Sequence, residues 1–409
     1  MGDFAVLLDR LIETRHISVH ELAAHVPCSA GHISNLRNGK KQPSPTIAER
    51  LDHLLGADGE LCRAARSPAA TREPADSRAL LNELAGQAIE LGRWVETSNV
   101  GDGTIGQLDD MLDRISRDYL RMPPEPLVSR AAEIARQVGF LLRERQRLRH
   151  ARDLYVIGSK AYAFLSWVAG DLGQLAAAAA HGRAALILAD ECGHQGARAL
   201  AFCALSKTAF WDGHLRRAAE FAREGYDCAS ANSTRALLAC QEADATDART
   251  ALDALQRAKR AQEDITRDDD LSGVFACGQV RTANYSIGVH VRNGDLAMAI
   301  DAAETAAIWG ANEEIGYGTR GQIQIGAALA LIGMNELDGA AERLQVVLDL
   351  PPDQRLATLT GRLREVPPAL RRGPYATDHQ ASDLADHIRV FCQEAVTVRA
   401  LPAGDGGSH

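Results

Sequence analysis

Lysine is scarce in this 409-residue sequence, with only five present, so arginine supplies most of the 45 basic residues. Long apolar runs are also missing: no stretch approaches the about 18 uninterrupted apolar residues that a membrane-spanning helix needs. The first ten residues carry acids where a signal peptide would need a basic region. These absences lead us to expect a cytoplasmic protein without membrane contact.

Recognisable catalytic and metal-binding motifs are missing as well. The eight cysteines are scattered, with no C-x-x-C pair and no zinc-type Cys/His spacing. The sequence contains no Walker A loop, no G-x-S-x-G, no H-E-x-x-H and no glycine fingerprint after a strand. We therefore expect no enzyme activity, no cofactor and no metal ion. The acidic run 267–270 is interpreted as a solvated loop between helices.

Charge is distributed unevenly along a chain whose net charge is −9. Residues 1–66 hold as many acids as bases, so the remainder carries the whole excess of acid. Within the first block, residues 26–50 contain four bases and one acid, Glu49. A local positive patch on an acidic protein indicates nucleic-acid contact confined to that patch.

The first 66 residues show four segments with helical apolar spacing. Ser18 and Glu21 form a capping-box pattern, and Ser29 is a good N-cap for the third segment. Gly39 is placed to end that segment in a left-handed conformation. The expected helices are 4–12, 19–26, 30–37 and 45–55, with Gly56 following the last.

Beyond this block the pattern predicts an all-α chain. Residues 67–77 read as a linker, because they contain two prolines and no large apolar side chain. Helical patterns then dominate, without convincing strand alternation. We expect a helical connector at 78–158, repeats at 159–350, a helical C-terminal cap at 351–400 and a disordered tail at 401–409.

Internal periodicity is the strongest signal in the second part. Five segments align as second helices of helical hairpins, and all carry alanine at their fourth position. Small residues recur there because two helices approach closely. The segments, beginning at Leu175, Leu215, Ala248, Leu296 and Leu337, resemble degenerate tetratricopeptide repeats; a generic α-solenoid is the alternative. The predicted fold is therefore an N-terminal helix-turn-helix domain followed by a tetratricopeptide-like α-solenoid.

Residues 18–44 resemble the helix-turn-helix of the xenobiotic-response-element (XRE) family related to phage repressors. The most diagnostic stretch is Ile33-Ser34-x-Leu36-x-x-Gly39-Lys-Lys-x-Pro43-Ser44. The resemblance implies that the second helix crosses the DNA backbone while the third enters the major groove. The residues expected at the DNA are Ser29, Ala30, Gly31, His32, Ser34, Asn35, Arg37, Asn38, Lys40 and Lys41.

Within this set, base reading and phosphate contact fall to different residues. The family usually has a longer polar side chain near the start of the third helix, where this sequence has Ala30 and Gly31. We therefore assign base reading to His32, Ser34 and Asn35, since an Asn amide can bond an adenine edge twice. We assign phosphate contact to Arg37, Asn38, Lys40 and Lys41, because phosphate contacts position the protein without specifying sequence. The plainer alternative is that His32 and Asn35 are exposed polar residues without a specific role.

A nearly neutral domain with so few basic contacts should bind DNA weakly by itself, because phosphate neutralisation dominates affinity. Two copies on a two-fold related operator would compensate, so we expect a homodimer on double-stranded DNA.

The repeat register also predicts a concave groove lined by the first helix of each hairpin. Its candidate ligand residues are Lys160, Trp167, Lys207, Phe210, Trp211, Arg281, Asn284 and Gln322. Their amide, cationic and aromatic groups suit a signalling peptide, a small molecule or a segment of a partner protein. Alternatively, the aromatic residues are simply core, and the cations are solvated or ion-paired.

The layout resembles actinobacterial regulators with an N-terminal helix-turn-helix and degenerate repeats. That resemblance implies a transcriptional regulator whose repeat domain dimerises and senses a ligand. The alternative is an adaptor in which the repeats bind a partner protein and DNA binding is auxiliary.

Overall fold

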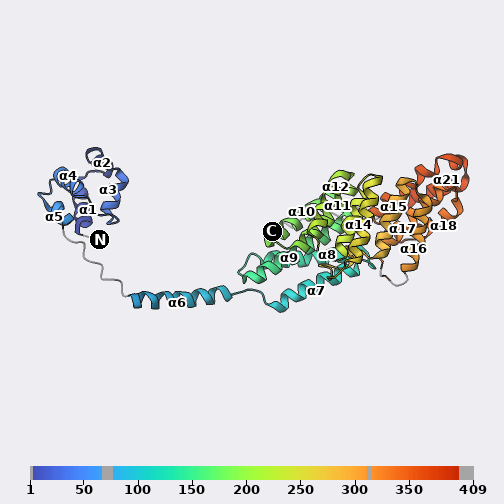
Figure 1. Cartoon of the computed structure of the whole chain (residues 1–409), viewed down its shortest axis with the longest axis horizontal. Coiled ribbons are helices and arrows are strands. Elements are labelled where there is room, and N and C mark those ends of the chain that lie inside the picture. Colours follow the sequence, from blue (N-terminus) through green and yellow to red (C-terminus); the bar gives the residue numbers. More distant parts are fainter. Residues whose placement is uncertain (1–2, 67–76, 311–312, 314, 396–409) are drawn as a thin grey trace. The chain divides into compact units, whose positions relative to one another are not determined.

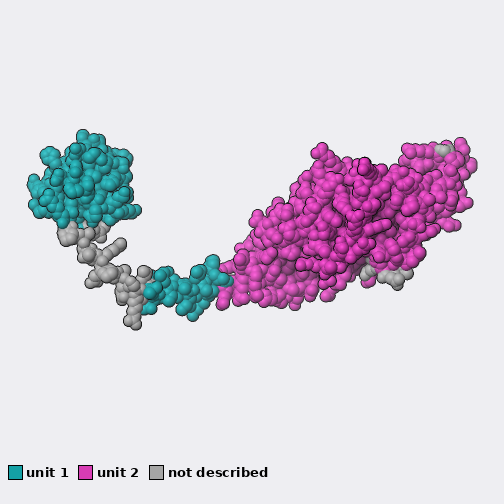
Figure 2. Space-filling model, in the orientation of Figure 1, with its two compact units in different colours: residues 1–95 teal, residues 96–409 magenta. Residues whose placement is uncertain are grey.

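A computed structural model describes residues 3–66, 77–310, 313 and 315–395. All the regular structure in these residues is helical, as the sequence predicts. The chain divides into two compact units, residues 1–95 and 96–409 (Figure 2). None of the described helices combines the length and apolar character needed to cross a bilayer. The expected linker, apart from Ser77, and the tail at 401–409 lie outside the described residues.

The N-terminal domain is a small helical bundle. Its helices are α1 (Asp3–Arg15), α2 (Val19–His25), α3 (Ala30–Arg37), α4 (Pro45–Leu55) and α5 (Glu60–Arg66). The capping box of Ser18 and Glu21 is confirmed, as is the Ser29 cap, and Gly39 has the left-handed φ of 70°. Ile33 and Leu36 bury one side of α3 in the shared core. Local sequence signals therefore set the start and end of α3.

Helix α5 was not predicted, and the reason is visible in Asp52. The Asp52 carboxylate is 9% exposed and accepts hydrogen bonds from the backbone N–H groups of Gly59, Leu61 and Cys62. This side chain from α4 satisfies the first turn of α5, so the capping signal lies outside the helix that it starts.

The second unit is an array of antiparallel helical hairpins that stack side by side (Figure 1). Two leading helices are followed by five hairpins, and the first helix of each hairpin packs on the first helix of the next. The leading helices are α7 (Asp102–Asp118) and α8 (Pro124–Leu141). The hairpins are α9/α10 (Leu148–Asp171, Leu175–Cys192), α11/α12 (Gln195–Trp211, Leu215–Cys228), α13/α14 (Ser233–Asp244, Ala248–Glu263), α15/α16 (Gln279–Asn293, Leu296–Trp309) and α17/α18 (Tyr317–Gly333, Leu337–Leu348).

Small residues set the spacing within this array. All five aligned segments begin a helix at the predicted residue, and the alanine at each fourth position is buried. At Gly182 of α10, a Cβ would lie 2.7 Å from the Leu205 side chain of α11; at Gly225 of α12, it would lie 2.6 Å from Leu238 of α13. Both distances are shorter than carbon atoms tolerate, so glycine permits these helices to approach.

The acidic run at 267–270 lies in a loop between helices, as the sequence suggested, but only Arg267 and Asp268 of the run are exposed. Asp269 accepts hydrogen bonds from the backbone and hydroxyl of Ser233 and from the backbone N–H of Thr234. Asp270 accepts a bond from the side chain of Asn232. The run thus satisfies the N-terminus of α13 from another part of the chain.

The C-terminal region closes the array. Helices α19 (Ala357–Leu363), α20 (Val366–Leu370) and α21 (His379–Gln393) pack with α17 and α18 around a core that includes Leu344, Leu359 and Phe391. Helix α19 also contacts α9, near the other end of the array. This return of the chain brings Thr358 and Arg362 to the concave face.

Candidate functional site

Two regions carry the residues selected from the sequence: the outer face of α3 and a cavity in the helical array. On α3, His32 and Asn35 lie three residues apart on one side of the helix, next to the buried side that carries Ile33 and Leu36, and both are half-buried. Among the described residues, no hydrogen bond engages the side chain of His32 or Asn35. Their polar groups are therefore available to base edges.

The other selected residues surround that face. Gly31, Asn38, Lys40 and Lys41 are exposed, while Ala30 and Ser34 are half-buried. Ser29 is occupied by the cap of α3, where its hydroxyl accepts a bond from the backbone N–H of His32. These positions fit contact with a duplex but stay predictions.

Arg37 departs from its expected role at phosphate. Its guanidinium forms an ion pair with Asp9 of α1 and a second with Glu13 at 3.5 Å. An arginine neutralised by two acids of its own domain adds little to DNA affinity. Among the described residues of the segment 26–50, this leaves Lys40, Lys41 and Arg50 as the basic side chains without an ion pair.

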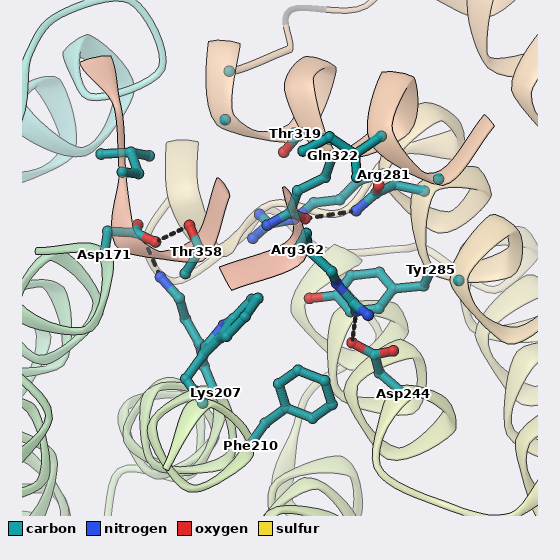
Figure 3. A pocket seen from close by; sticks show the side chains of 18 of the residues that line it. Asp171, Lys207, Phe210, Asp244, Arg281, Tyr285, Thr319, Gln322, Thr358 and Arg362 are labelled. Carbon is teal, nitrogen blue, oxygen red and sulfur yellow. Dashed lines mark hydrogen bonds and ion pairs between the residues drawn. The ribbon is translucent and has the colours of Figure 1, made fainter. Parts of the chain in front are cut away.

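The cavity lies on the concave face of the array, and its empty volume is about 1240 Å³, including the part open to solvent. Helices α9, α11, α13, α15, α17 and α19 line it (Figure 3). Seven of the eight residues selected as groove candidates are among its lining: Trp167, Lys207, Phe210, Trp211, Arg281, Asn284 and Gln322. The repeat register therefore brings residues from four different helices to one place.

Lys160 is the exception. It is 8% exposed and pairs with Asp109 of α7 at 2.9 Å, away from the cavity lining. For Lys160 the structure therefore agrees with the alternative that the cation is ion-paired and does not face a groove.

One end of the cavity is organised around Asp171, a residue that the sequence analysis did not select. Its carboxylate accepts hydrogen bonds from the hydroxyls of Tyr119 and Thr358, each at 2.9 Å, and pairs with the Lys207 ammonium at 2.8 Å (Figure 3). Lys207 also lies 3.9 Å from the centre of the Trp167 ring. Four elements thus meet at one buried carboxylate.

Burial lowers the pKa of Lys207 to about 8, although the neighbouring Asp171 carboxylate acts in the opposite direction. Positively charged Arg281 lowers the pKa of Lys207 further. The cavity therefore contains a cation that can lose its proton slightly above neutral pH.

A second buried carboxylate, Asp244, joins three helices. It pairs with Arg292 of α15 at 2.6 Å and with Arg362 of α19 at 2.8 Å (Figure 3). The Arg362 guanidinium lies 5.5 Å and 5.7 Å from the ring centres of Phe210 and Trp211, so cation–π contacts support the same arrangement.

Arg281 differs from the other cations of the lining. It donates to the backbone carbonyls of Val274 and Ala276 and lies 5.0 Å from the centre of the Trp167 ring. Within the described residues it has no carboxylate partner, whereas Lys207, Arg292 and Arg362 each have one. Asn284 on the next turn of α15 bonds Gln322 of α17 at 3.0 Å.

Two buried polar atoms of the lining lack hydrogen bonds in the part of the chain that the structure describes. They are the hydroxyl of Tyr317 and the side-chain oxygen of Gln241. Gln241 is only 5% exposed, and its amide nitrogen is held by the carbonyl of Cys203 at 3.0 Å. A buried polar group without a partner is costly, so these atoms mark places where a ligand or ordered water can bond.

Comparison with known protein families finds a match within the first unit. Residues 3–65 match the family model of a helix-turn-helix domain. No curated protein matches the chain. The match, together with the polar side chains on α3, supports a DNA-binding regulator.

Proposed function

We propose that the protein is a transcriptional regulator of the XRE type that acts as a homodimer and responds to a ligand bound in its helical array, whose repeats we interpret as tetratricopeptide-like. The family match supports the DNA-binding part. The ligand-binding part rests chiefly on one observation: residues chosen from the repeat register meet in a single cavity that contains unpartnered buried polar atoms.

The charge of the lining indicates the chemical class of the ligand. Four cations, Lys207, Arg281, Arg292 and Arg362, face three carboxylates, Asp171, Asp244 and Glu365. Since Arg281 is the cation without a carboxylate partner among the described residues, it is the natural position for an anionic group. Trp167, Phe210 and Trp211 supply aromatic surface beside it. The ligand is an aromatic or apolar carboxylate, such as the C-terminus of a short apolar peptide.

The DNA-binding proposal is tested by footprinting purified full-length protein on the DNA that flanks its own gene. We expect sequence-dependent protection that weakens as salt increases. If no fragment is protected at low salt, the N-terminal domain is only a helical scaffold without DNA-binding activity, and the adaptor alternative is favoured.

Replacing Arg281 with methionine should weaken binding of aromatic carboxylates on the order of 10- to 100-fold, because a charge-assisted hydrogen bond contributes about 1.5–3 kcal/mol. Indole-3-acetate and 3-phenylpropionate, each compared with its neutral amide, are suitable probes for tryptophan fluorescence titration. Arg136→Met, at an exposed site on α8, is the matched control and should bind like the wild type. Equal binding of acids and amides would contradict the assigned class.

Binding of these acids should also weaken severalfold as the pH rises through about 8. Below that pH, Lys207 is protonated and balances Asp171; above it, Lys207 is neutral, and the lining gains one net negative charge. Repeating the titration between pH 6.5 and 9.5 measures the effect. In Lys207→Arg the side chain stays protonated throughout, so persistence of the pH step in this variant would show that another group causes it.

A further inference from the structure

Helix α6 (Ser77–Glu96) exposes an apolar face that the rest of its unit does not cover. None of the side chains from 81 to 96 is buried. The apolar side chains Leu81, Leu84, Ile89, Leu91 and Val95 are between 47% and 64% exposed. Such helices gain most of their stability by packing an apolar face, so α6 lacks the contact that would stabilise it.

The spacing of these residues identifies what fits the face. Leu81, Leu84, Ala88, Leu91 and Val95 follow one another at alternating intervals of three and four residues. This is the seven-residue repeat of a two-stranded coiled coil, in which the average period of 3.5 keeps one seam turned toward a partner helix. A second helix of the same period is therefore the complementary surface.

We propose that α6 pairs with α6 of a second copy of this chain, in parallel and in register, and that this pairing forms the homodimer. In the heptad, Leu84 and Leu91 occupy the d positions, while Leu81, Ala88 and Val95 occupy the a positions. Leucine at d with a β-branched residue at a, as at Val95, favours two strands.

The charges on α6 also fit a self-pair. In a parallel pair of identical helices, each residue beside the seam faces its own copy or a near neighbour. The positions flanking the seam include Ala85, Gln87 and Gly92, which carry no charge, while Glu83 and Glu90 lie farther round the helix. No like charges therefore oppose pairing along this stretch, and no flanking charge selects a foreign partner.

Parallel pairing has a consequence for DNA binding, which rests on the proposed function. It places the N-terminal ends of both α6 helices together, next to the two segments that lead to the helix-turn-helix domains. The ten residues between α5 and α6 can extend at most about 36 Å, while adjacent half-sites lie about 34–36 Å apart. Two helix-turn-helix domains joined in this way can reach successive major grooves.

The pairing is tested by sedimentation of full-length protein at micromolar concentration without DNA. We expect a dimer for the wild type and a monomer for Leu84→Glu/Leu91→Glu. Both leucines are exposed, so their replacement should leave the folds of the helix-turn-helix domain and of the helical array intact. The matched control Ile187→Glu/Ile308→Glu changes two exposed apolar residues of α10 and α16 and should stay dimeric. A monomeric wild type, or a variant that stays dimeric, overturns the proposal.

The orientation is tested by oxidising the single variants Leu84→Cys, Leu91→Cys and Ala88→Cys and measuring the cross-linked dimer. Wild-type protein oxidised in parallel gives the background from the protein's own cysteines. Parallel in-register helices should cross-link in both variants. Cross-linking of Ala88→Cys alone would indicate antiparallel pairing and overturn the assigned geometry. A dimer that binds no DNA would refute the regulator but retain this interface, so the two proposals fail separately.

Discussion

Lys40→Gln/Lys41→Gln should reduce affinity for the protein's own operator on the order of 10- to 100-fold at about 0.1 M salt. Both side chains are exposed just after the end of α3, and neither forms an ion pair with another described residue. Each phosphate neutralised by a lysine releases counterions, so the slope of log affinity against log salt should become shallower by about 0.9 for each lost contact. Fluorescence anisotropy of a labelled operator over a salt series measures both quantities.

The control for this pair is Lys259→Gln/Arg260→Gln, which removes two adjacent exposed bases from α14 in the second unit. Because the net charge changes equally, a general effect of charge would appear in both proteins. If the two variants lose affinity to the same extent, the lysines after α3 do not contact phosphate. The preference of each variant for the operator over unrelated DNA should change little, since phosphate contacts carry no base information.

The largest expected change in stability follows from Asp244→Ala, at about 3 kcal/mol of unfolding free energy. Removing one partner from a buried ion pair leaves an uncompensated charge, which usually costs about 3–5 kcal/mol. The Asp244 side chain is 8% exposed, but Arg292 and Arg362 retain partial contact with solvent, which places the expected value at the lower limit. Urea unfolding followed by circular dichroism measures this difference.

Asp386→Ala is the comparison. Its ion pair with Arg389 on α21 is exposed on both sides, and such pairs contribute about 0–1 kcal/mol. Equal destabilisation by the two changes would mean that Asp244 does not act as the buried joint between α13, α15 and α19. A destabilised Asp244→Ala protein that still binds aromatic carboxylates would separate the structural role of this residue from the role proposed for Arg281.

Several features were predictable because their causes are local in the sequence. The serine caps of α2 and α3 and the left-handed glycine after α3 follow from residues within a few positions of the helix ends. The start of the second helix in each of the five hairpins was visible because small residues recur wherever two helices approach. Seven of the groove residues followed from that register, since a hairpin array turns its first helices toward one face.

The missed features depend on contacts between distant residues. Asp171 and Asp244 look like ordinary helix-end acids until Thr358 and Arg362 reach them from the far end of the chain. Arg37 was assigned to phosphate because its acidic partners, Asp9 and Glu13 on α1, are far from it in the sequence. No periodicity encodes such pairings, because each depends on how separate elements pack in three dimensions.

The hydrogen bond from Thr358 to Asp171 joins residues at opposite ends of the helical array. In an open stack of repeats each unit touches only its neighbours, so the terminal units fray independently. Here the last segment is fastened to the first hairpin, and α19 cannot detach without breaking bonds at α9 and α13. The array consequently gains long-range cooperativity: melting at its C-terminal end disturbs its N-terminal end directly.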